Sequence, residues 1–331
     1  MSFDLNPFID WIKNTFEPQM RVDGKAGRYA RSVGDTTLEL YGVSDMACVL
    51  HAINALDVSA ETHANFKESF YELTEDSTGF IKEVDQTHCT MHNTAFALGG
   101  MNLLGIPAKV PLHFAKDYDT KEKMTAFLES EIDWENVVYG GSHEGAGLAS
   151  ALTLVPGTVP QQWFRDYFDY LDTKFDPNNG MMGINKPAGG DTDQIGGTFH
   201  YHFLYEHYNR RMPYGAACID SVLAQQLDNG EWTETNPWWM TLDAFYLLTR
   251  SLRHSHHRAD EVTAAIRKTV AMCYERIMDE DLREKYFGGH FAVHSLTCCT
   301  NIFAEAQNFL GNKEIISEKP LQLVLDRRPF I

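Results

Sequence analysis

DMACVLHAINAL at residues 45–56 and NTAFALGGMNLL at residues 93–104 are two copies of one small, apolar segment. The alignment places Asn54 on Asn102 and Leu56 on Leu104. Similar segments rich in Ala, Gly and Leu follow at residues 141–155, 196–208, 239–252 and 294–310. A period of roughly 50 residues indicates a repeat architecture, because each unit buries its apolar surface against its neighbours. We therefore predict six inner helices that are apolar on nearly all sides.

Six segments of a second kind alternate with these inner helices. Their apolar residues recur at i, i+3, i+4 and i+7, which is typical of a helix with one buried and one solvated face. They are residues 5–16, 61–73, 120–132, 161–175, 214–227 and 259–278.

The alternation predicts an all-α fold, a single (α/α)6 toroid of six helical hairpins spanning residues 1–331. An open α-solenoid is the alternative, and the lack of an evident polar capping repeat disfavours it. A short C-terminal tail occupies about residues 312–331. Its aliphatic residues at near-alternating positions predict that it is ordered.

Composition narrows the classes of function. The chain has 44% hydrophobic residues, enough for a large core, and a formal charge of −18 that argues against nucleic-acid binding. It shows neither a secretory start nor a run of about 18 apolar residues, so we expect a cytoplasmic protein without a membrane span. The six cysteines form no CxxC pair, which predicts reduced, buried thiols.

One motif carries a resemblance to known proteins. Gln226-Leu-Asp-Asn-Gly230-Glu-Trp232 is similar to the Q-xxx-G-x-W motif of squalene and hopene cyclases. The whole pattern of outer helix, glycine turn and inner helix resembles the α/α-toroid superfamily. That superfamily includes terpenoid cyclases, protein prenyltransferase β-chains, and six-hairpin glycosidases and polysaccharide lyases. The resemblance implies a fold rather than an activity, because the motif ties an outer helix to its turn.

A toroid brings the first turns of all its inner helices to one mouth, where we expect the functional site. Carboxylates in an apolar cavity acquire separated pKa values, as general acid–base catalysis requires. Alternatively, Asp45 and Asp243 only cap their helices. The predicted catalytic acids are Asp45, Glu144, Asp191, Asp193 and Asp243.

Aromatic, histidine and arginine side chains near the same mouth are predicted to bind the substrate. Flat rings stack on sugars or stabilise a carbocation, and arginines neutralise an acidic substrate. These residues are Arg28, Arg31, Tyr41, His88, His92, Asn93, His143, His200, Tyr201, Trp238, Trp239 and His294.

Asp191-Thr192-Asp193-Gln194 also resembles a known motif, the D-x-D-D of class II terpenoid cyclases. The middle acid of that motif protonates an alkene, so the resemblance implies that Asp193 is a proton donor. Gln194 stands where the family has its last Asp, and a solvated turn is the alternative interpretation.

No cofactor is predicted. A metal ion is conceivable through His88 and His92, whose i, i+4 spacing suits a ligand pair on one helix, with Glu144 or His294 completing the site.

Three hypotheses for function follow. The leading one is a carbohydrate-active enzyme, a glycoside hydrolase or a lyase or epimerase acting on an oligosaccharide. The second is a terpenoid-cyclase-like enzyme in which Asp193 protonates a small-molecule substrate in an aromatic cavity. The third is a toroid that binds a ligand without catalysis. The oligomeric state stays open.

Overall fold

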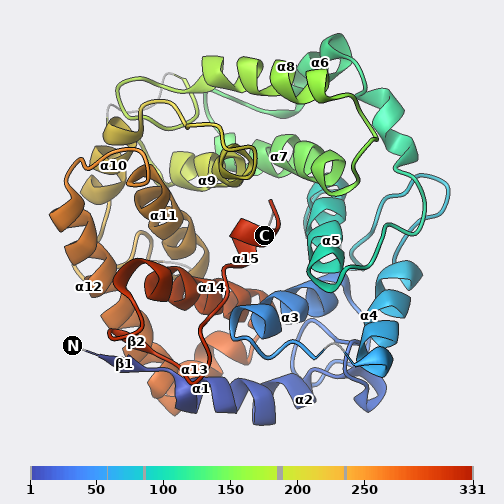
Figure 1. Ribbon diagram of the computed structural model, residues 1–331, viewed down its shortest axis with the longest axis vertical. Helices are drawn as coiled ribbons and strands as arrows, with labels where there is room; N and C mark the ends of the chain where they lie inside the picture. Colours follow the sequence, from blue (N-terminus) through green and yellow to red (C-terminus); the bar gives the residue numbers. More distant parts are fainter. Residues whose placement is uncertain (1, 58, 85–86, 185–188, 235–236, 330–331) are drawn as a thin grey trace.

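The computed structural model describes residues 2–57, 59–84, 87–184, 189–234 and 237–329, and it arranges them as two concentric rings of helices (Figure 1). The inner ring consists of α3 (Leu40–Ala52), α5 (Thr90–Leu104), α7 (Val138–Leu154), α9 (Thr192–His207), α11 (Pro237–Ser251) and α14 (Ala292–Leu310). Each inner helix contacts the next one, and α14 contacts α3, so the ring is closed. The predicted toroid is confirmed, and each inner helix begins a few residues before its predicted start.

The outer ring follows the amphipathic segments. It consists of α1 (Asn6–Trp11), a π-helical turn (Ile12–Phe16), α2 (Glu17–Gln19), α4 (Ala60–Glu72), α6 (Lys121–Glu131), α8 (Gln161–Leu171), α10 (Gly215–Ala224) and α12 (Ala259–Met278). Short 3-10 turns lie at Val22–Gly24, His113–Asp117 and Asp172–Lys174. Strands β1 (Phe3–Asp4) and β2 (Ile315–Ile316) pair in parallel.

Helix α13 (Glu280–Phe287) was not predicted. Its sequence, EDLREKYF, is too short and too charged to show a helical period. Aromatic contacts hold the helix: the buried ring of Phe287 stacks on Trp238 with centroids 5.5 Å apart and also lies 6.2 Å from the ring of Phe8.

The Gln226–Trp232 motif has the structural role that its chemistry suggests. The side-chain nitrogen of Gln226 donates to the carbonyl oxygens of Gly230 and Ala265, at 3.3 and 3.2 Å. The indole of Trp232 donates to the carbonyl of Val222 at 2.8 Å. The motif therefore joins α10, its turn and α12.

The C-terminal tail enters the ring and covers one end of it (Figure 1). It contains the short helix α15 (Val324–Arg327). Arg328 is fully buried, donates to the carbonyl of Phe96 at 3.2 Å and lies over the Phe96 ring at 4.8 Å. The backbone of Gln322 donates to the carbonyl of Ala52, at the end of α3. The tail therefore closes the end of the toroid where the inner helices finish.

Two further features concern the whole described chain. Within the described residues, no helix is both long and apolar enough to span a membrane. All six cysteines are free thiols, five of them buried, as predicted.

Candidate active site

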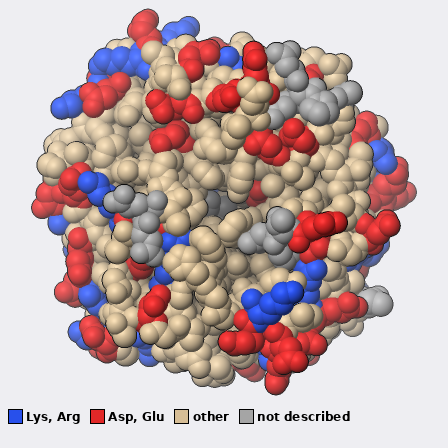
Figure 2. All heavy atoms as spheres, turned by 180° about the vertical axis from the view of Figure 1, so that it is seen from behind, with Lys and Arg blue, Asp and Glu red and all other residues tan. Residues whose placement is uncertain are grey.

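The first turns of the inner helices surround a cavity of about 400 Å³. This volume lies within the range of about 300–1,000 Å³ that is usual for small-molecule sites. Figure 2 shows this face of the molecule, with a hollow at the centre of the ring and most acidic side chains toward the rim. The described lining residues are Thr87, His88, Cys89, His92, Tyr139, Gly140, His143, Phe199, His200, Trp239, Leu242, Asp243, His294 and Cys298.

Asp243 is the described lining residue that carries a carboxyl group. It lies in the second turn of α11 and is only 4% exposed. Its Oδ2 atom is buried and has no hydrogen-bond partner among the described residues. Burial raises the pKa of Asp243 well above its ordinary value of 3.8. Burial therefore favours the protonated form of Asp243, which faces a cavity lined by aromatic and histidine side chains.

His294 and Asp45 form a second acid–base group at the cavity. The Nδ1 atom of His294 lies 3.1 Å from both carboxylate oxygens of Asp45. Asp45 is fully buried behind the histidine, whereas His294 itself lines the cavity. The carboxylate accepts the Nδ1 proton, which leaves Nε2 as the ring nitrogen that can accept a proton.

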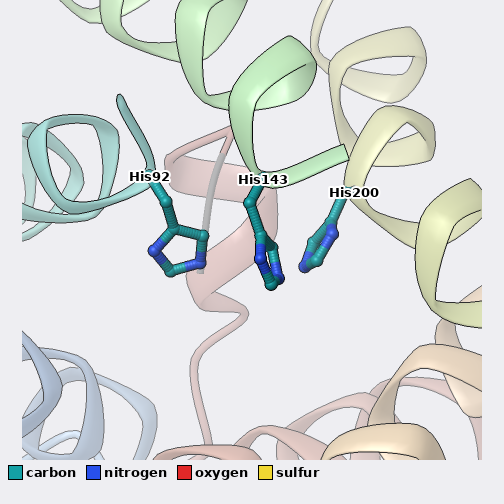
Figure 3. A group of neighbouring side chains, drawn as sticks. All are labelled: His92, His143 and His200. Atoms are coloured by element: carbon teal, nitrogen blue, oxygen red, sulfur yellow. The ribbon is translucent and has the colours of Figure 1, made fainter. Parts of the chain in front are cut away.

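Three histidines from neighbouring helices form another part of the wall. Figure 3 shows His92, His143 and His200 side by side, on α5, α7 and α9 respectively. The His92 Nδ1 atom lies 2.7 Å from the Tyr41 hydroxyl, and the His200 Nδ1 atom lies 2.7 Å from the Ser142 hydroxyl. Each of these two rings is thus held by a buried hydroxyl group.

A layer of paired charges lies beside the cavity wall. Arg31 is buried and forms an ion pair with Glu83 at 2.5 Å, while its guanidinium lies over the Tyr41 ring at 5.0 Å. Burial would raise the pKa of Glu83, but hydrogen bonds from His88 and Thr87 outweigh it and lower that pKa to about 2. Arg31 therefore compensates a buried carboxylate and does not line the cavity, which corrects its predicted role.

Asp191 and Asp193 do not line the cavity either. Asp191 is the N-cap of α9, where its carboxylate accepts the backbone N–H of Gln194 at 2.9 Å. The two oxygens of Asp193 accept the backbone N–H groups of Val138 and Tyr139, at 2.8 and 3.1 Å. Asp193 thereby caps α7 from the neighbouring helix. The D-x-D sequence stabilises helix ends, which is the favoured use of acids at these positions.

Glu144 and Asn93 are not among the residues that line the cavity. Burial raises the pKa of Glu144, and its side chain is directed toward Cys89. The Asn93 side chain accepts a hydrogen bond from the Tyr41 hydroxyl at 3.1 Å and donates to the carbonyl of His88. Adjacent helical residues differ in direction by about 100°, so His143 reaches the cavity and Glu144 does not.

The same rotation separates the predicted aromatic residues. Trp239 lines the cavity, whereas Trp238 stacks on Phe287 outside it. Tyr201 is buried with its ring centroid 6.0 Å from that of Trp134, on the outer side of α9. Arg28 pairs with Glu72 on the surface at 3.2 Å. The predicted binding roles of these residues have no support in the geometry.

Sequence reasoning missed several lining residues, among them Tyr139 and Cys298. Tyr139 was missed because α7 begins earlier than predicted, and its ring stacks on His200 with centroids 5.3 Å apart. Cys298 follows His294 by four residues, and this i+4 spacing is the signal that could have identified it.

The predicted metal pair is not formed. Helix α5 begins at Thr90, so His88 lies outside it and the i, i+4 geometry does not apply. The rings of His88 and His92 are instead stacked nearly parallel, with centroids 4.8 Å apart and an interplanar angle of 14°.

Comparison with known proteins supports the fold. No family model and no curated protein matches the chain. A solved structure of a type II terpene cyclase, MstE from Scytonema in complex with its substrate geranylgeranyl dihydroxybenzoate, is similar over 92% of this chain and 99% of that one. The TM-score is 0.52 and the sequence identity is 11%. The likeness shows a shared α/α-toroid fold.

The geometry of the cavity does not support the carbohydrate hypothesis. Glycoside hydrolysis ordinarily uses two carboxyl groups that flank the scissile bond. Among the described residues that line the cavity, Asp243 carries the only carboxyl group. The comparison likewise offers no glycosidase or lyase, and an oligosaccharide substrate is therefore not supported.

Proposed function

We propose that this chain is an acid-initiated cyclase of the type II terpene cyclase kind, with Asp243 as the proton donor to an isoprenoid substrate. One observation carries the proposal: Asp243 is a buried carboxyl group whose burial favours the protonated form, with an unpartnered oxygen among the described residues, and it faces a cavity whose lining includes Phe199, Trp239 and Leu242. The shared fold with a type II terpene cyclase adds support.

The reaction would begin with proton transfer from Asp243 to an alkene carbon. The O–H bond breaks, a C–H bond forms, and the electron pair of the double bond leaves a carbocation in the substrate. A buried acid is suited to this step, because burial disfavours its charged form and so favours the protonated one. The carboxylate that remains regains a proton from water at the end of the cycle.

The carbocation would be guided by the aromatic wall. Phe199, Trp239 and Tyr139 present π-systems to the cavity, and aromatic faces attract positive charge. Neighbouring double bonds of the substrate would then add to the cation in turn, which closes rings without any further reagent.

His294 would end the reaction by removing a proton from the cyclised cation. Its Nε2 lone pair accepts the proton, and the buried carboxylate of Asp45 stabilises the imidazolium that forms. The product is an isomer of the substrate, since one proton enters and one leaves. The proposed acid, Asp243, lies on α11, and the proposed base, His294, lies on α14.

The test compares two Asp→Asn variants of the full chain. Purified protein is incubated with farnesyl and geranylgeranyl compounds that carry alcohol, diphosphate or dihydroxybenzoate groups, and products are separated by gas or liquid chromatography with mass detection. We expect cyclic isomers from the unmodified protein and a loss of about 10²-fold or more in Asp243→Asn. Asp193→Asn is the matched control and should remain active while folded. Equal activity of Asp243→Asn and the unmodified protein would overturn the proposal.

A further inference from the structure

We propose that His92, His143 and His200 form a binding site for a divalent transition-metal ion, with zinc as the best-fitting ion. One ring nitrogen of each histidine lies within 4.8 Å of the corresponding atoms of the other two. The three imidazoles come from three successive inner helices and lie together at the cavity wall (Figure 3). This site goes beyond the proposed cyclisation, in which no step needs a metal.

The hydrogen bonds around the cluster orient two of the rings as ligands. The Ser142 hydroxyl donates to the carbonyl of Tyr139 at 2.5 Å, so it accepts the Nδ1 proton of His200 at 2.7 Å. The lone pair of His200 is then on Nε2. A metal-binding histidine almost always donates its other ring N–H to a neighbouring oxygen in this way.

His92 has the same arrangement on the opposite side of the cluster. The Tyr41 hydroxyl donates to the Asn93 side-chain oxygen at 3.1 Å and therefore accepts the Nδ1 proton of His92 at 2.7 Å. The lone pair of His92 is again on Nε2. Two independent hydroxyl groups, from α3 and α7, thus set the same tautomer in two of the three histidines.

The pKa values of the three histidines favour binding of a cation. Burial and the neighbouring histidines lower the pKa of His143 to about 3, and burial lowers those of His92 and His200 well below their ordinary value. The direction of all three pKa shifts favours the neutral imidazole, which presents a lone pair. This supports the geometric argument, because neutral imidazole is the form that binds metals.

The donor set selects the kind of ion. Three imidazole nitrogens suit zinc, cobalt, nickel or copper, whereas calcium and magnesium prefer oxygen ligands. Three histidines leave the fourth position of a tetrahedral ion for water or for an oxygen atom of the substrate head group.

The experiment measures metal binding without any turnover, so it stands apart from the cyclase assay. The full chain is stripped with a chelator, and Zn²⁺ alone is titrated in competition with a chromophoric chelator. Co²⁺ serves as the spectroscopic probe, because a tetrahedral site gives visible absorption bands. We expect one equivalent of bound metal. Ser142→Ala, which removes only the partner of His200, should weaken binding by about 10–100-fold.

His143→Ala should abolish the cobalt bands, and circular dichroism checks that the variant is folded. The matched control is His256→Gln, because His256 is exposed in a surface group of histidines that includes His257, the partner of Asp220. It should bind metal like the unmodified protein. Failure of the unmodified protein to bind, unchanged affinity in both His143→Ala and Ser142→Ala, or loss in His256→Gln would overturn the proposal.

Discussion

The imidazole of His294 contacts both carboxylate oxygens of Asp45 at 3.1 Å, although 249 residues separate the two in sequence. Asp45 lies on the first inner helix and His294 on the last, so this contact is made where the ring closes. The Thr297 hydroxyl adds a hydrogen bond to the backbone carbonyl of Asp45 at 3.2 Å. Ring closure therefore also builds the acid–base pair at the cavity.

Asp45→Asn should impair catalysis more than folding. An asparagine keeps the shape but cannot stabilise an imidazolium, so turnover should fall by about 10²–10⁴-fold. Steady-state kinetics with the isoprenoid compound that the unmodified protein cyclises is the measurement. Thr297→Val is the control, since it removes a hydrogen bond from the same place, costs about 1 kcal/mol of stability and leaves the pair intact. Full activity in Asp45→Asn would exclude His294 as the assisted base.

The buried acid Asp243 predicts a specific dependence of stability on pH. Its pKa is raised in the folded protein, so between pH 3.8 and that raised pKa the folded state binds more protons than the unfolded state. The contribution of Asp243 to the free energy of unfolding therefore decreases as pH rises through this window.

Urea unfolding at pH 5 and pH 8 tests this dependence. Asp243→Asn should gain stability relative to the unmodified protein at pH 8, and the gain should shrink toward pH 5. Asp193→Asn provides the comparison, because Asp193 accepts two backbone hydrogen bonds at a helix end. A difference between Asp243→Asn and the unmodified protein that does not change with pH would mean that Asp243 is ionised in the folded state.

The buried pair of Arg250 and Glu305 should matter for stability. Arg250 is 1% exposed, Glu305 is 2% exposed, and two hydrogen bonds of 2.6 and 2.7 Å join them. Glu305→Gln leaves a buried guanidinium without its countercharge, so we expect a loss of about 3–5 kcal/mol. Asp326, on the tail, contacts the same guanidinium at 3.1 Å but is 39% exposed. Asp326→Asn should cost about 1 kcal/mol or less. Equal losses in urea titrations would contradict this ranking.

The architecture could be predicted from the sequence because it depends on periodic patterns. The aligned segments at residues 45–56 and 93–104 indicate the repeat, and the i, i+3, i+4 spacing separates outer from inner helices. Helix α13 and the helix in the tail are too short to show a period. The position of the site at the mouth followed from the same topology, since all first turns meet there.

The individual site residues were harder to predict, because a single helical step rotates a side chain by about 100°. Trp239 and His143 therefore line the cavity while their neighbours Trp238 and Glu144 do not. The D-x-D motif suggested that Asp193 is a proton donor. In the structure its carboxylate instead accepts the backbone N–H of Val138, at the start of α7. No local pattern could have indicated that contact.

The most direct test of the proposed function is the fate of the proton that starts the reaction. The unmodified chain is incubated with its isoprenoid substrate in deuterium oxide, and the cyclic product is analysed by mass spectrometry and NMR. Protonation by Asp243 predicts one solvent-derived deuterium on carbon in each product molecule and no detectable product from Asp243→Asn. A cyclic product without carbon-bound deuterium would contradict acid initiation.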